Sequence, residues 1–240
     1  MPIIISQIIA ATLGYALGIV ISIRNKTEKS KLATYFVYAD ILLSTEILVY
    51  TTGLIFRSDY TYFHAASKLV LGFAISYAYR MAYAMKTDPK GIMDKLFIYS
   101  PIFVFIINGL IILQYPALHT NDVFLITNGK IPSYFTAIAN LLFGTVIVGI
   151  LISYFIRFKK VDPQAAWKPF FIALGLFILV VLESLPDLFT KNIVVGVVGN
   201  LGYFIGYSIV SIKLFEKTPT NVENKPLQQM DGTITSVPGF

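Results

Sequence analysis

The chain has 240 residues, of which 56% are hydrophobic and only 13% are charged, and its mean hydropathy is +0.71. Soluble domains carry about 25% charged residues, so this composition excludes an ordinary soluble fold and indicates an integral membrane protein. The net charge is +6. Nucleic-acid binding requires a basic face on a soluble fold, and this composition lacks such a fold, so we expect no nucleic-acid partner.

Seven apolar runs follow one another along the chain, each close to the roughly 20 residues that cross a bilayer. They are continuous, whereas the strands of a membrane barrel are alternating segments of about 10 residues. The sequence therefore predicts an all-α, polytopic membrane bundle with seven transmembrane helices, built as one domain over residues 1–216. The expected helices cover residues 3–23, 33–56, 62–85, 96–115, 134–156, 169–188 and 193–214.

Basic residues are distributed unevenly over the connections between these spans, and the positive-inside rule places the richer side in the cytoplasm. One set of connections holds fourteen Lys and Arg residues and the other set holds three. We therefore expect an N-terminus outside, a cytoplasmic C-terminus and a multi-pass protein of the plasma (cell inner) membrane. The basic run RNKTEKSK is most simply a cytoplasmic anchor, and binding of anionic membrane lipids there is an alternative.

Two connecting segments differ from the short loops elsewhere. The segment PALHTNDVFLITNGKIPS between the fourth and fifth spans is long enough to cover the external mouth of the bundle and contains turn signals. Residues 217–240 are polar and contain three prolines, so they cannot bury a core and are expected to form a disordered cytoplasmic tail. A membrane or cytoplasmic protein partner could order that tail.

Glycine pairs with a four-residue spacing predict where helix backbones approach closely. Gly14 and Gly18 form such a pair in the first span, and Gly202 and Gly206 form one in the seventh. Contact inside the bundle is one interpretation of these pairs. Homo-oligomer formation through an outward-facing first helix is the other, and the spacing alone leaves both open.

The third span, KLVLGFAISYAYRMAYAMK, carries two cations, Lys68 and Arg80. A charge at the bilayer centre costs roughly 2.5 to 3.5 kcal/mol, so such residues normally face the bundle interior and find partners. Asp40 lies at the depth of Arg80, and we expect these two to form a structural ion pair. Glu46 lies near the depth of Lys68. Asp40 and Glu46 are six residues apart, so they point about 120° away from one another and cannot both lie centrally against the third helix. At least one of the two pairs must reach sideways or involve another helix.

A second layer of polar residues lies toward the outside and is the predicted ligand-binding site. Three acids around one lysine leave negative charge uncompensated, which favours a bound cation or proton in a pocket below the external loop. The residues of this layer are Glu46, Tyr50, His64, Lys68, Glu183 and Asp187.

The sequence offers no catalytic constellation, so we expect a protein that is not an enzyme and has no cofactor or metal. The two histidines, His64 and His119, both lie toward the outside, which excludes a paired-histidine haem and an H-E-x-x-H zinc site. Residues 192–212 lack the lysine that a retinal Schiff base requires. Cysteine is absent, and no phosphate-binding loop or nucleophile elbow occurs.

Several segments together resemble the seven-transmembrane sensor module found at the N-terminus of some histidine kinases. They are SKLVLGFAISYAYRMAYAMKTD in the third span, GKIPSYFTAIANLLFGTVIVG opening the fifth, LESLP late in the sixth and GYSIVSIKLFE closing the seventh, with Pro101 in the fourth. The resemblance implies a ligand-sensing bundle. Members of that family continue into a PAS, kinase or cyclase domain, whereas residues 217–240 alone follow here, so a signal would pass to a separate protein.

Three functions remain open on the sequence. The first is a receptor-like or accessory module that binds a small ligand or a partner within the bundle. The second is a structural subunit of a larger membrane complex, and the third is a small-solute or proton transporter. No inverted repeat and no pair of interrupted helices favours the transporter.

Overall fold

Seven α-helices make up almost all of the computed structural model, which describes residues 2–84, 91–116, 118–119, 126–127, 130–188 and 193–215. The all-α prediction is confirmed, and each predicted span coincides with one helix to within a few residues at most ends. The helices are α1 (Pro2–Glu28), α2 (Lys31–Ile55), α3 (Tyr60–Ala84), α4 (Ile92–Gln114), α5 (Lys130–Phe158), α6 (Pro163–Leu188) and α7 (Ile193–Phe215).

Short elements occupy two of the connections. A single 3₁₀ turn, η1 (Arg57–Asp59), joins α2 to α3. In the long connection between α4 and α5, β1 (Leu118–His119) pairs antiparallel with β2 (Ile126–Thr127), with Leu118 opposite Thr127. The sequence analysis predicted a loop there, and two-residue strands are too short to leave a hydrophobic pattern. The predicted tail, residues 217–240, lies outside the described residues.

Four helices in the described part of the chain are long and apolar enough to cross a membrane: Ile4–Thr27, Lys31–Ile55, Ile92–Gln114 and Lys130–Phe158. A shorter apolar helix covers Ala166–Leu182. The four candidate spans support a membrane protein with transmembrane helices. The third helix, α3, is outside this set, and it is the helix that carries both Lys68 and Arg80.

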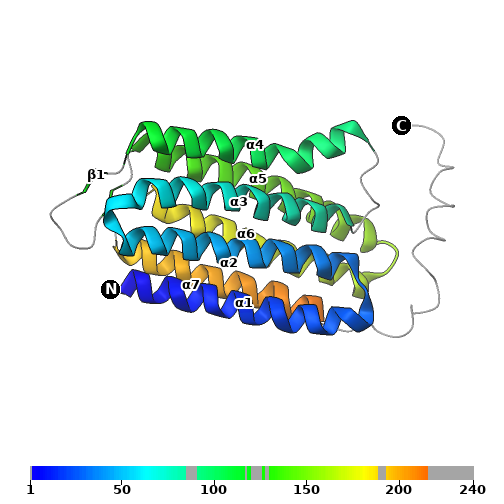
Figure 1. The fold of residues 1–240 in the computed structure, drawn as a ribbon. Helices are drawn as coiled ribbons and strands as arrows, with labels where there is room; N and C mark the ends of the chain where they lie inside the picture. The colour runs from blue at the N-terminus through cyan, green and yellow to red at the C-terminus, as the bar shows by residue number, and fades with distance from the viewer. Residues whose placement is uncertain are drawn as a thin grey trace.

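The helices lie side by side (Figure 1), and the contacts between them close into a ring. Along the chain, α2 packs against α1 and α3, and α6 packs against α5 and α7. Contacts of α3 with α5 and of α7 with α1 complete the ring, while α4 packs mainly on the outside of α3. One end of the bundle, here named the hairpin end, holds the N-terminus, η1 and β1 (Figure 1). The α1–α2 connection lies at the opposite end.

A tight turn between α1 and α2 makes these two helices antiparallel neighbours. Lys29 adopts a positive φ of 50°, which reverses the chain, and the side chain of Ser30 caps α2 by accepting from the Ala33 amide at 3.4 Å. The Asn25 side chain accepts from the Ser30 amide and donates to Thr34, at 2.8 Å in each case. This turn fixes which face of α1 lies against α2, and that face carries the glycine pair of the first span.

Candidate functional site

A buried ion pair joins α2 to α3 near the hairpin end. Lys68 Nζ donates to Glu46 Oε1 at 2.9 Å, and the two side chains are only 8% and 6% exposed. The sequence analysis placed both residues at one depth, and the structure brings them into direct contact. Because the charges neutralise each other, this pair can lie inside a bundle where either charge alone would be costly.

Aromatic rings cluster beside the lysine of this pair. Lys68 Nζ lies 5.7 Å from the centre of the Tyr50 ring, and Tyr60 OH donates to Tyr50 OH at 3.1 Å. The His64 ring lies 5.4 Å from the ring centres of both tyrosines. Four predicted ligand residues, Glu46, Tyr50, His64 and Lys68, therefore form one packed cluster. Tyr60, the first residue of α3, is a member that the sequence analysis did not single out, because it precedes the predicted span.

The other two predicted ligand residues lie near the C-terminal end of α6. Glu183 and Asp187 fall within the helix, but their side chains lie outside the described part of the structure. Their place in the layer with Glu46 and Lys68 therefore stays a prediction.

The structure does not bring Asp40 and Arg80 together as the predicted ion pair. Arg80 Nη2 donates to Tyr99 OH at 2.7 Å, and its guanidinium lies 5.2 Å from the Tyr77 ring centre and 5.3 Å from the Tyr99 ring centre. Arg80 thus faces α4, whereas Asp40 lies on the face of α2 that packs against α1. Two residues at one depth can only pair when their helix faces meet, and these faces do not.

Gly14 and Gly18 make room for the Asp40 side chain. A Cβ atom at Gly18 would lie 2.7 Å from Asp40 Oδ2, and one at Gly14 would lie 3.1 Å from Asp40 Oδ1 and closer still to Ser44 Oγ. The glycine pair of the first span therefore packs inside the bundle, against α2. The alternative of an outward-facing pair does not agree with this placement.

The glycine pair of the seventh span lies against α6. A Cβ atom at Gly202 would collide with the Leu182 side chain, and one at Gly206 would collide with the Gly175 carbonyl. A Cβ atom at Gly175 would in turn lie 2.6 Å from the Gly206 carbonyl oxygen. Gly175 is a contact that the sequence analysis missed, because a lone glycine in a span carries no spacing signal.

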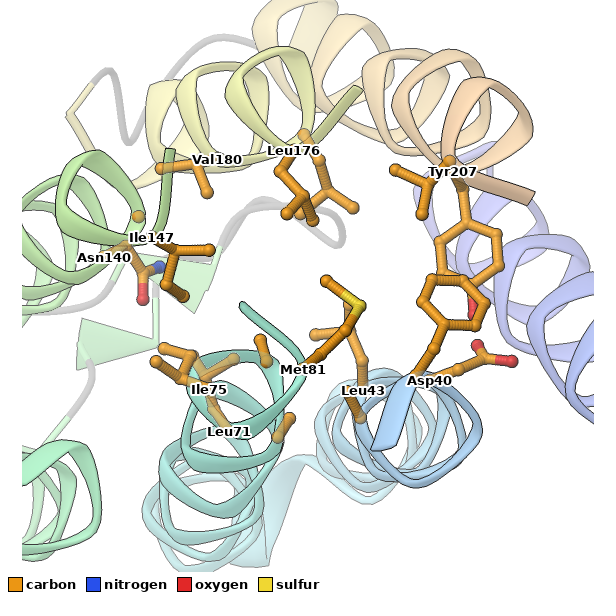
Figure 2. A pocket seen from close by; sticks show the side chains of 17 residues that line it. Asp40, Leu43, Leu71, Ile75, Met81, Asn140, Ile147, Leu176, Val180 and Tyr207 are labelled. Carbon is orange, nitrogen blue, oxygen red and sulfur yellow. The ribbon is translucent and has the colours of Figure 1, made fainter. Parts of the chain in front are cut away.

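A central cavity lies inside the ring of helices (Figure 2). It offers about 80 Å³ to the centre of a water-sized molecule and is lined by side chains from α2, α3, α5, α6 and α7. Most of the lining is aliphatic, and its polar residues are Asp40, Asn140 and Tyr207. Small residues such as Ala39 and Ala74 border the space, and their short side chains leave it open.

Asn140 brings an unused acceptor to this cavity. Its side chain is 6% exposed, and within the described ranges its Oδ1 atom has no hydrogen-bond partner. Figure 2 shows Asn140 on the side of the cavity opposite Asp40 and Tyr207. Asn108 on α4 also has an Oδ1 atom without a partner in these ranges, but its Nδ2 donates to Thr136 Oγ1 on α5 at 2.8 Å, a bond between two helices. The cavity can therefore hold a mainly apolar molecule, and its wall includes polar groups of Asn140 and Tyr207 that have no hydrogen-bond partner in the described ranges.

Comparison of the chain with protein-family models, with curated proteins and with solved structures finds no match.

Proposed function

We propose that the protein is a receptor-like or accessory membrane module that binds a small ligand within its helical bundle and acts through a separate protein. The observation that carries this proposal is the central cavity, which helices from both halves of the chain enclose. A ligand there contacts five helices at once, so its binding free energy can favour one packing of the ring over another.

All seven helices cross the membrane in this proposal. The three helices outside the apolar set, α3, α6 and α7, have 25, 26 and 23 residues. At about 1.5 Å per residue each exceeds the roughly 30 Å thickness of the hydrocarbon core. The asymmetry of basic residues supports an external N-terminus and a cytoplasmic C-terminus in a plasma membrane.

The ligand that fits this cavity is small and mainly apolar, and it carries a hydrogen-bond donor. One water molecule needs about 10–15 Å³ measured by its centre, so the cavity accepts a group of several water-sized units. The aliphatic side chains of Leu71, Ile75 and Leu176 provide the apolar contacts, and Asn140 Oδ1 accepts from the donor. The outer cluster of Glu46, Tyr50, His64 and Lys68 lies one to two helical turns nearer the hairpin end. Its ion pair holds α2 and α3 together on that side.

A cavity-filling variant tests this proposal. Ala74 is 4% exposed and lines the cavity, so Ala74→Leu places a larger side chain into the ligand's space. The matched control is Ala66→Leu, the same change on the exposed face of the same helix. We expect mass spectrometry of the purified wild type and the control to detect a retained small molecule that Ala74→Leu lacks. Equal retention in all three, or none in the wild type, contradicts the proposal and favours the structural-subunit alternative.

A further inference from the structure

The carboxylate of Asp40 lies in a niche between α1, α2 and α7. Asp40 is 2% exposed, and Figure 2 shows its carboxylate directed toward the blue ribbon of α1, away from the centre of the cavity. Both of its oxygens lie against the glycine pair of α1, with Oδ1 facing Gly14 and Oδ2 facing Gly18. The niche is therefore a separate place from the apolar cavity, although Asp40 borders both.

Three side-chain oxygens converge on the Gly14 face of α1. A Cβ atom built at Gly14 would lie 3.1 Å from Asp40 Oδ1, 3.2 Å from Tyr203 OH and nearest of all to Ser44 Oγ. Three groups thus meet at one place: the Asp40 carboxylate and the Ser44 hydroxyl from successive turns of α2, and the Tyr203 phenol from α7. Glycine at position 14 is what allows them to meet there.

The spacing of these oxygens suits ligands of a cation better than partners in a hydrogen bond. Ser44 Oγ donates to Asp40 Oδ1 at 3.4 Å, well beyond the usual length of about 2.7 Å for such a bond. Two oxygens at this separation lie at right angles around an ion that is about 2.4 Å from each, a usual oxygen–cation distance.

The charge of the niche also requires compensation. In the described part of the chain, Asp40 forms no salt bridge, and its Oδ2 atom has no hydrogen-bond partner. A buried, uncompensated carboxylate is costly inside a bundle. A proton on Oδ2 would neutralise the charge, but it would leave the convergence of Ser44 Oγ and Tyr203 OH beside Oδ1 unused. A cation instead neutralises the charge and uses the converging oxygens.

We propose that Asp40, Ser44 and Tyr203 form a binding site for one sodium ion between α1, α2 and α7. One carboxylate balances one positive charge, so a monovalent ion leaves the niche neutral. The ion would hold α7 to α2 beside α1, at the point where the ring closes. This site lies apart from the proposed cavity ligand, since its oxygens face α1.

Thermal unfolding of the purified full chain in detergent tests the site. The chain is heated in NaCl, KCl or choline chloride at equal ionic strength, without other cations. We expect the melting temperature to rise saturably with NaCl, less with KCl and not with choline chloride, because a ligand of the folded state stabilises it by mass action. Asp40→Asn should abolish the sodium response. Asp59→Asn, a change at an exposed carboxylate in η1, should leave it intact.

Direct binding of ²²Na⁺ provides the second measurement, and it keeps the test decisive if Asp40→Asn does not fold. Ser44→Ala removes one oxygen without adding bulk, and we expect about tenfold weaker ²²Na⁺ binding or worse. An equal rise of the melting temperature in NaCl and choline chloride overturns the proposal. So does a sodium response that survives in Asp40→Asn, or undiminished ²²Na⁺ binding by Ser44→Ala. A response to KCl equal to that in NaCl overturns the assignment of sodium.

Discussion

Replacement of Lys68 by methionine should destabilise the bundle strongly, because it leaves the Glu46 carboxylate buried without its partner. The two charges lie 2.9 Å apart and are almost fully shielded from solvent. Their mutual attraction amounts to about 6 kcal/mol at an effective dielectric constant of about 20. Removal of one member of such a pair typically costs about 3–5 kcal/mol, since part of the attraction offsets desolvation. We expect a loss in that range.

A double-mutant cycle separates the ion pair from simple packing. Lys68→Met and Glu46→Leu each leave one charge unpaired, whereas the double variant leaves none. The double variant should therefore lose less free energy of unfolding than either single variant, which additive packing effects would not produce. The assay is equilibrium unfolding of the purified protein by titration of SDS into mixed micelles.

Lys95→Met is the matched control, since Lys95 is exposed near the start of α4. It should change the free energy of unfolding by less than about 0.5 kcal/mol. The reasoning fails if Lys68→Met behaves like this control. It also fails if the double variant loses the sum of the two single losses, because the residues would then not be coupled.

Two further predictions concern helix packing and the tail. Gly206→Ala should lower the free energy of unfolding by about 1–3 kcal/mol in the same titration, because the added methyl meets the Gly175 carbonyl, while Gly149→Ala should be neutral or stabilising because nothing lies within 4 Å of its Cβ position. Equal effects of the two changes would refute the close α6–α7 contact. Truncation after Glu216 should leave the melting temperature unchanged, given the polar composition of residues 217–240, and a clear decrease would show that the tail packs on the bundle.

Sequence was sufficient for the helices and for the depth of each charge, but not for the direction in which each side chain points. Hydrophobic length predicts the helices because a bilayer sets how many apolar residues are needed. Depth follows from the rise per residue, and it correctly placed Lys68 beside Glu46. The direction in which a side chain points around its helix axis has meaning only relative to the neighbouring helices that each face meets. The 120° between Asp40 and Glu46 implied two directions, but the sequence does not tell which acid faces α3.

The cavity and the α6–α7 contact depend on several helices at once, which explains why no single segment predicted them. Ala39 and Ala74 belong to two different helices and are unremarkable within each run. They open a space only because the ring brings them to one level. Gly175 likewise matters only through the Gly206 backbone opposite it. Such features require the tertiary arrangement, since a short side chain in a span gives no periodic signal.

Helix α2 carries two buried acids, Glu46 in the cluster near the hairpin end and Asp40 in the niche between α1, α2 and α7. Glu46 points to α3 and is neutralised by Lys68, whereas Asp40 points to α1 and belongs to the proposed sodium site. Asp40 and its neighbour Leu43 on the same helix also line the central cavity. A cation on one face of α2 and a ligand against its other face would therefore bias the same helix. By thermodynamic linkage, each would then change the affinity of the other by the same factor.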